Sequence, residues 1–238
     1  MHENLEKIKS FESPPKIIEN FISPDEVSQF LKLYETLPVA VNNLKQKVIK
    51  KRWLEGFEKE LEKLFTERLE AIIGNYKMDN LITEDKKECF GLFQESYNPI
   101  KLHVDAGFNF KDLIYKQTLL PLSEYGETVI FKNRFYGIST SFTKNEKELL
   151  ENDPQNYKKG KNERSNQHLK MFSDKSFDVD NYEKYLKHED IENLKGLEVE
   201  YVYKWKLGDL FIFDRTHLHC SSCNIKNKKI GLATFTKK

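Results

Sequence analysis

His103 and Asp105 are the residues whose types and spacing point most directly to chemistry. Residues i and i+2 of a β-strand point to the same face, so His103-Val104-Asp105 can offer one imidazole and one carboxylate to a single metal ion. A third candidate ligand comes much later, at His217 or His219. Two histidines and one carboxylate form a facial triad that leaves positions on Fe(II) open for other ligands.

An isolated His-x-Asp pair is more often a surface pair or a hydrogen-bonded core histidine than a metal site. The order of segments favours ligation here. The pair lies in a strand-like run, and the late histidines follow an apolar run at 208–214. Alternation along a strand puts His217 and His219 on the same face, so the residues alone leave both of them open as the third ligand.

Cys220 and Cys223 have the spacing of a zinc or redox pair. The chain contains no second pair, and its one other cysteine is the distant Cys89. The surrounding pattern also lacks the strand-helix-strand setting of a redox dithiol. We therefore interpret both residues as small side chains in a turn.

Length and composition predict one large domain, because 238 residues with 13% aromatic side chains can fill a full core. The 39 basic and 38 acidic residues leave a formal net charge of +1, so no overall field favours nucleic acid or anionic lipid. The N-terminal stretch is charged, and no segment has the length and apolarity of a membrane span. We expect a cytoplasmic protein with reduced cysteines, and composition does not predict its oligomeric state.

The elements that must position these residues fall into two groups. A strand is predicted at 15–22, and a helix at 24–37 begins with Ser23 as N-cap and Glu26 as the capping-box partner. A second helix is predicted at 54–73 by a 3.6-residue apolar stripe that stops at Gly74. Short strand-like runs follow at 89–97, 101–105, 115–122, 127–132, 137–142, 198–206, 209–214 and 229–236.

Strands at this spacing predict a β-sandwich or jelly roll, so the fold class is α+β. A polar stretch at 144–196 interrupts the strands and contains helical patterns at 145–151 and 181–194. A long insertion between strands is either a lid over a site or a solvated excursion without function.

Four segments resemble motifs of the Fe(II)/2-oxoglutarate dioxygenase superfamily, in its phytanoyl-CoA dioxygenase-like and prolyl-hydroxylase-like branches. They are His103-x-Asp105, Tyr125-Gly126-Glu127-Thr128, the run Gly208 to Asp214, and His219-Cys220-Ser221-Ser222-Cys223-Asn224, which is similar to the family's His-x-Ser-x-x-Asn. The resemblance extends from about Phe90 to the C-terminus, without the insertion.

The resemblance implies a fold and a domain plan. The fold is a double-stranded β-helix, or jelly roll, with the N-terminal helices packed on one sheet. Residues 1–238 would form one oxygenase domain, with 1–88 as a mainly helical support, 89–143 and 197–238 as the jelly-roll core, and 144–196 as an insertion that could act as a lid.

The resemblance also implies a set of site residues. His103, Asp105 and His219 would bind Fe(II), with His219 preferred to His217. Lys229, ten residues beyond His219, would bind the far carboxylate of 2-oxoglutarate, with Lys228 as the alternative. Gln117 and Thr128 are weaker candidates for the same co-substrate. Further candidates, for contact with substrate, are Arg134, Tyr136, Arg215 and His217.

The implied activity is oxidation of a small metabolite by dioxygen and 2-oxoglutarate, with release of succinate and CO2. Asp105 favours a hydroxylase over the family's halogenases, in which a small residue replaces the carboxylate. Desaturation and ring closure stay open, and the substrate is not identified. The alternatives are a cupin-like module that binds a metal or small ligand without turnover, and an oxygenase acting on a protein or nucleic acid.

Overall fold

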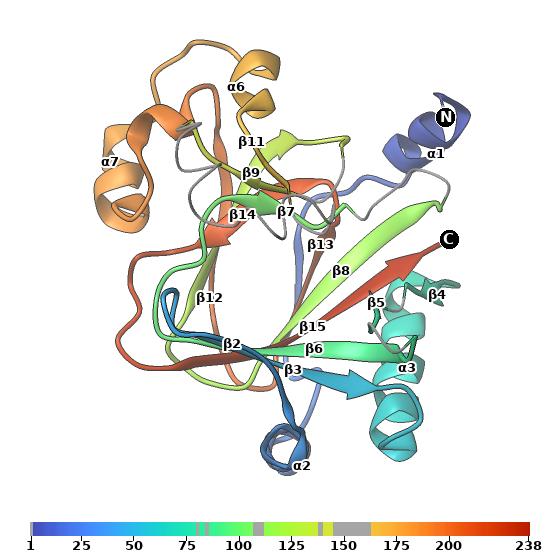
Figure 1. The fold of residues 1–238 in the computed structure, drawn as a ribbon. Coiled ribbons are helices and arrows are strands. Elements are labelled where there is room, and N and C mark those ends of the chain that lie inside the picture. The colour runs from blue at the N-terminus through green and yellow to red at the C-terminus, as the bar shows by residue number, and fades with distance from the viewer. Residues whose placement is uncertain (1, 80, 84–85, 107–111, 138–139, 145–162) are drawn as a thin grey trace.

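The computed structural model of the chain describes residues 2–79, 81–83, 86–106, 112–137, 140–144 and 163–238 (Figure 1). The strands of the described residues form two sheets that are antiparallel except for the pairing of β10 with β11. The larger sheet has the order β1-β13-β8-β15-β6-β3-β2, and the smaller has the order β11-β10-β7-β14-β9-β12. This arrangement agrees with the predicted jelly-roll-like sandwich of the α+β class.

The larger sheet is formed by β1 (Lys16–Ile18), β2 (Val39–Asn43), β3 (Val48–Leu54), β6 (Glu88–Ser96), β8 (Ile114–Pro121), β13 (Leu210–Asp214) and β15 (Lys229–Lys237). Two short strands extend it, β4 (Lys77–Met78) beside β15 and β5 (Leu81–Ile82) beside β6. The smaller sheet contains β7 (His103–Val104), β9 (Glu127–Arg134), β10 (Thr140–Phe142), β11 (Glu163–Ser165), β12 (Val199–Lys204) and β14 (His217–Ser221).

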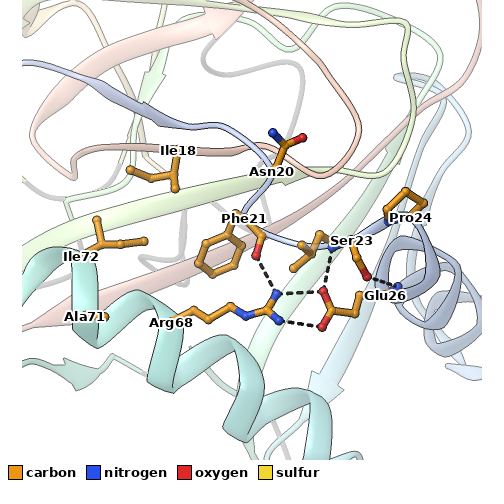
Figure 2. A pocket seen from close by; sticks show the side chains of 10 residues that line it. Ile18, Asn20, Phe21, Ser23, Pro24, Glu26, Arg68, Ala71 and Ile72 are labelled. Carbon is orange, nitrogen blue, oxygen red and sulfur yellow. Dashed lines mark hydrogen bonds and ion pairs between the residues drawn. The ribbon is translucent and has the colours of Figure 1, made fainter.

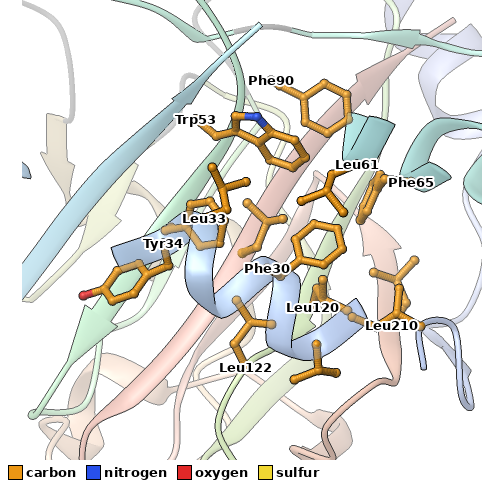
Figure 3. Close-up of a cluster of buried hydrophobic side chains, with 14 of the residues drawn as sticks. Phe30, Leu33, Tyr34, Trp53, Leu61, Phe65, Phe90, Leu120, Leu122 and Leu210 are labelled. Atoms are coloured by element: carbon orange, nitrogen blue, oxygen red, sulfur yellow. The ribbon is translucent and has the colours of Figure 1, made fainter. Parts of the chain in front are cut away.

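Helices α2 (Pro24–Thr36) and α3 (Lys59–Ile73) pack on one face of the larger sheet, as predicted. The capping box forms, because Ser23 Oγ accepts from the Glu26 amide while the Glu26 carboxylate accepts from the Ser23 amide. Figure 3 shows the core beneath the helices, where the Phe30 ring lies edge-on to Trp53 at 5.8 Å between centroids. Helix α1 (His2–Ser10) was not predicted.

A second core lies between the two sheets, where Ile130 and Tyr203 of the smaller sheet meet Phe211 and Phe213 of the larger. The Tyr203 and Phe211 rings stack with centroids 4.6 Å apart. This contact joins β12 to β13 across the sandwich. The side chains that alternate inward from these strands therefore share one interior.

The described part of the insertion is packed against the outer face of the smaller sheet. Phe177, Leu186 and Leu194 are buried there in the core that also contains Val129 and Leu218. Its helical pieces are α6 (Gln167–Met171), α7 (Val179–Asn181), a π-helical turn at Tyr182–Leu186 and a 3-10 turn at Ile191–Leu194. The continuous helix predicted at 181–194 is therefore broken, and the helix predicted at 145–151 lies outside the described residues.

No sequence pattern predicted the hairpin that β2 and β3 form. Strand β3 carries Lys50, Lys51 and Arg52 in succession, so polar and apolar residues do not alternate along it. Trp53 nevertheless anchors the strand, because its side chain is fully buried under α2 and α3. The first 88 residues thus add strands to the larger sheet as well as helices.

Candidate metal centre

His103, Asp105 and His219 come together between the sheets. Strand β14 pairs with β7 so that His219 is directly opposite His103. One potential ligand atom from each of the three residues lies within 4.8 Å of the others. Asp105 Oδ2 is 3.4 Å from His219 Nε2 and 3.7 Å from His103 Nε2. Within the described part of the chain, this is the one group of histidine, cysteine and acidic side chains close enough to hold a metal ion.

Hydrogen bonds orient both imidazole rings so that Nε2 is available to a metal. His103 Nδ1 lies 2.8 Å from the Lys101 carbonyl oxygen, and His219 Nδ1 lies 3.0 Å from the His217 carbonyl oxygen. A carbonyl oxygen only accepts, so each Nδ1 carries the proton and donates. Each Nε2 is then unprotonated and carries the lone pair that could bind a metal.

The protonation states also suit a metal. Burial lowers the pKa of His103 to about 4, so its ring is neutral at pH 7. Burial opposes ionisation of Asp105, but the nearby His103 and His219 outweigh it and hold the pKa of this carboxyl below its ordinary value. A neutral His103 ring and an ionised Asp105 carboxylate are the forms in which these two residues bind a metal, and with His219 they make the residue set of a facial-triad Fe(II) site.

Gln117 of β8 lies against this group. Its Nε2 is 3.4 Å from Asp105 Oδ2 and 3.3 Å from His219 Nε2. Its side-chain oxygen Oε1 is buried without a hydrogen-bond partner among the described residues. A buried carbonyl oxygen without a donor is costly, so Gln117 has an unused acceptor at the edge of the candidate metal centre.

His217 lies beside the candidate centre but is held by other groups. Its Nδ1 accepts from the Asp214 amide at 3.1 Å and from Arg134 at 2.8 Å. Its Nε2 therefore carries the proton and donates to Glu200 Oε2 at 3.2 Å. Burial, reinforced by the Arg134 charge, lowers the pKa of His217 to about 2. Neither ring nitrogen is left for a metal.

The other three residues predicted to contact substrate also have partners within the fold. Arg134 Nη1 lies 2.8 Å from Asp214 Oδ2, and the Tyr136 hydroxyl donates to Glu12. Arg215 pairs with Asp79 and donates from Nε to the Asp105 carbonyl oxygen at 3.0 Å. Arg215 thus supports the backbone of a candidate ligand, while Arg134, Tyr136 and His217 belong to a polar network at the start of β14.

Lys229 points into the interior between the sheets and is 3% exposed. Its Nζ donates to Ser221 Oγ at 2.6 Å and lies 4.6 Å from the centroid of the Trp205 ring. Burial lowers the pKa of Lys229 to about 8. Ser221 is two residues beyond His219 on β14, about 7 Å along the strand. Lys229 therefore contacts the same strand that carries the third candidate ligand.

The neighbours of Lys229 fit it closely. A Cβ at Gly126 would lie 2.6 Å from Lys229 Cδ, so only glycine allows the lysine to approach there. Trp205 also donates from Nε1 to Thr128 Oγ1 at 2.9 Å. Trp205 therefore contacts both the Lys229 ammonium and Thr128, which was predicted to contact the co-substrate. Lys228 is exposed, and its nearest described acid is Glu95 at 3.9 Å, on the helix-covered side of the sheet.

Two residues near Lys229, Trp205 and His188, were not predicted as site residues. Trp205 lies near the end of the strand predicted at 198–206, and His188 lies in the insertion. Burial, followed by the charges of Lys101 and Lys229, lowers the pKa of His188 to about 4, so its ring is neutral at pH 7. Only the three-dimensional packing of the insertion brings it near Lys229. The two cysteines, in contrast, stay apart from this chemistry, with Cys220 buried in the outer core and both thiols free.

A separate groove of about 710 Å³ lies between the segment 18–26 and helix α3. Figure 2 shows the side chains that line it. Arg68 of α3 crosses it and binds both oxygens of Glu26 at 2.8 Å. The same guanidinium also donates to the Phe21 carbonyl oxygen at 2.7 Å. The charged groups in this groove are already paired with one another, and the candidate metal ligands lie elsewhere.

Comparison with known proteins supports the fold assignment. No family model matches the sequence, and no curated protein matches it. A solved oxidoreductase of the 2OG-Fe(II) oxygenase family from Burkholderia pseudomallei is similar over 99% of this chain and 89% of its own, with 9% identity and a TM-score of 0.50. The non-haem alpha-ketoglutarate-dependent epimerase SnoN of nogalamycin biosynthesis is similar over 99% and 83%, with 9% identity and a TM-score of 0.50.

These likenesses show that the chain has the fold of the 2OG-Fe(II) oxygenase superfamily. The superfamily fold that the motifs implied is therefore confirmed. No helix among the described residues is long and apolar enough to cross a membrane.

Proposed function

We propose that this protein is a non-haem Fe(II)- and 2-oxoglutarate-dependent oxygenase with a double-stranded β-helix core, which oxidises a small organic molecule and releases succinate and CO2. One observation carries the proposal. A His-Asp-His group with both Nε2 atoms unprotonated lies between the same two sheets as a buried lysine, and β14 connects them through His219 and Ser221. A metal ion bound to the His-Asp-His group, with a dicarboxylate between that ion and Lys229, would use both the group and the lysine.

In this proposal, each residue has a separate task. His103, Asp105 and His219 hold Fe(II), which when bound supplies the chemistry of oxygen activation. Lys229 neutralises the far carboxylate of 2-oxoglutarate, because an anion buried without a cation is costly. Gln117 donates to Asp105 and restrains its orientation, while Thr128 and Trp205 border the co-substrate. Hydroxylation is the proposed outcome for substrate.

Anaerobic titration of the protein with Fe(II) and 2-oxoglutarate tests the proposal. We expect one metal per chain and binding of 2-oxoglutarate that requires the metal. Exposure to air in the presence of a metabolite library should then produce succinate with the substrates of the enzyme. Metal binding without any 2-oxoglutarate binding would contradict the proposal and favour a metal-binding module without turnover.

We also expect the affinity for 2-oxoglutarate to fall as the pH rises above about 8. Burial lowers the pKa of Lys229 to about 8 in the free protein, whereas a bound carboxylate favours the charged ammonium. Below this pH the lysine is already charged and the affinity is constant. Above it, binding must take up a proton, so the affinity should fall by up to about tenfold per pH unit.

Calorimetry at several pH values, in buffers of different ionisation enthalpy, measures both the affinity and the proton uptake. Lys229→Arg is the matched control, because a guanidinium stays charged over this range. We expect this variant to lose the pH dependence. A wild-type affinity that stays flat from about pH 7 to pH 10 would show that Lys229 does not contact the diacid.

A further inference from the structure

Lys50 and Arg52 of β3 point toward the interior between the sheets. Their neighbours Lys51 and Trp53 point the other way, since Lys51 Nζ donates to the Tyr34 carbonyl oxygen of α2 and Trp53 is buried under the helices. Successive residues of a strand alternate between faces. Lys50 is paired across the sheet with Gln94 of β6, and Gln94 is paired with Gly231 of β15, which lies on the face that carries Lys229.

The charge of Lys50 reaches the candidate metal ligands. Burial lowers the pKa of Lys50, and the negative charge of Asp105 acts in the opposite direction. The influence is mutual, because Lys50 contributes to the shifts of Asp105 and His103. Arg52 also acts on Lys50, as expected for a side chain two residues along the same face. Lys50 and Arg52 therefore form one basic patch on the interior face of β3.

This basic patch has no partner within the described part of the chain. Neither the Lys50 ammonium nor the Arg52 guanidinium forms a hydrogen bond or ion pair there, although both side chains are only half-exposed. Apart from Lys229, which is the proposed co-substrate ligand, the other interior cations named above are paired with acids. Lys116 and Arg134 pair with Asp214, and Arg215 pairs with Asp79. The charges of Lys50 and Arg52 are therefore available to pair with a bound anion.

The charges at the proposed site also leave Lys50 and Arg52 without a compensating anion. Fe(II) and Lys229 contribute three positive charges, and Asp105 with the 2-oxoglutarate dianion contributes three negative charges, so the loaded centre is neutral without the basic patch. Lys50 and Arg52 then add two positive charges that are not compensated. Like charges near one another in a partly dry interior repel strongly.

We propose that Lys50 and Arg52 bind an anionic group of the substrate, a carboxylate or a phosphate, and thereby place the rest of the substrate over the metal. Arg52 offers the planar fork that pairs with two oxygens, and Lys50 adds a point charge. This inference rests on the proposed oxygenase function and narrows its substrates to organic anions. Strand β3 would then select these anions, although it precedes Phe90, where the resemblance to the oxygenase superfamily begins.

The test uses the protein loaded anaerobically with Fe(II) and 2-oxoglutarate, and calorimetry with four small probes. Benzoate and phenyl phosphate carry the two candidate anions, while benzamide and benzyl alcohol are neutral controls with the same ring. We expect one of the two anions to bind at least about tenfold more tightly than the neutral probes, the scale of one charge-assisted contact. Which anion binds more tightly distinguishes a carboxylate substrate from a phosphate substrate.

The variants Lys50→Gln and Arg52→Gln should each lose most of this preference. Lys51→Gln, the neighbouring lysine on the opposite face, should keep it. Metal occupancy and 2-oxoglutarate affinity are measured in the same samples, and their failure in the wild type would contradict the proposed function itself. Intact metal and co-substrate binding, with no preference for either anion or with a preference unchanged in both variants, would overturn only the assignment of Lys50 and Arg52.

Thermal melting of the variants guards against a purely structural explanation. Lys50 makes no hydrogen bond to a described residue, and burial disfavours its charge. Lys50→Gln should therefore melt at the wild-type temperature or above it. A large loss of stability together with a lost anion preference would assign Lys50 to the fold and overturn its role in binding.

Discussion

His219→Ala is expected to weaken Fe(II) binding by about a hundredfold or more, because even the outer partners of metal ligands contribute tenfold to a hundredfold to affinity. The residue is buried, its Nε2 faces Asp105 at 3.4 Å, and its ring is held by the His217 carbonyl oxygen. His103→Ala and Asp105→Ala should have effects of the same order. Metal content after anaerobic loading and gel filtration measures all three.

His217→Ala is the matched control for this prediction. Its removal deletes a buried ring that connects Asp214, Arg134 and Glu200, so we expect lower thermal stability with metal occupancy retained. The carbonyl oxygen that orients His219 is a backbone group and survives the substitution. Loss of metal from His217→Ala together with full occupancy in His219→Ala would exchange the roles of the two histidines. Full occupancy in every variant would refute the metal centre.

Lys229→Ala is expected to weaken 2-oxoglutarate binding by about tenfold or more, equivalent to about 1.4 kcal/mol, with little effect on the metal. The side chain is 3% exposed, and its ammonium contacts Ser221 and the face of Trp205 with no acidic partner among the described residues. A carboxylate would supply the charge that this buried cation lacks. Calorimetry with Mn(II) in place of Fe(II) gives both affinities without turnover.

Lys228→Ala is the control for the lysine clamp. Lys228 alternates to the opposite side of β15 from Lys229, is exposed, and lies near Glu95, so its removal should leave the co-substrate affinity within about twofold. An unchanged affinity in Lys229→Ala would move the clamp to another cation. A loss of affinity shared equally by both variants would indicate a general electrostatic effect of this strand.

The local pattern of the sequence determined much of this protein. Alternation along the predicted strand at 229–236 puts Lys229 and Gly231 on one face, and the structure agrees, because Ile230 and Leu232 lie in the helix-covered core. The capping residues and apolar stripes predicted α2 and α3, and most strands of the core were predicted within a few residues. These features depend on periodicity and capping, which act over short distances along the chain.

The same reasoning failed where distant segments decide the outcome. His217 and His219 share a face by alternation, and only the pairing of β14 with β7 sets His219 opposite His103 while Glu200 and Arg134 engage His217. Strand β14 itself was missed, since a run of histidine, cysteine and serine has no strand-like alternation of apolar and polar residues.

Arg134, Tyr136 and Arg215 have the residue types of a substrate site, yet their partners Asp214, Glu12 and Asp79 come from elsewhere in the chain. Lys50 and Arg52 show the reverse, because a charged run that reads as a solvated surface becomes the interior face of a strand once Trp53 is buried. Residue types and spacing thus determined the chemistry that this chain can offer. Only the tertiary structure decided which charges are compensated, because ion pairs form between side chains that are close in space and far apart in sequence.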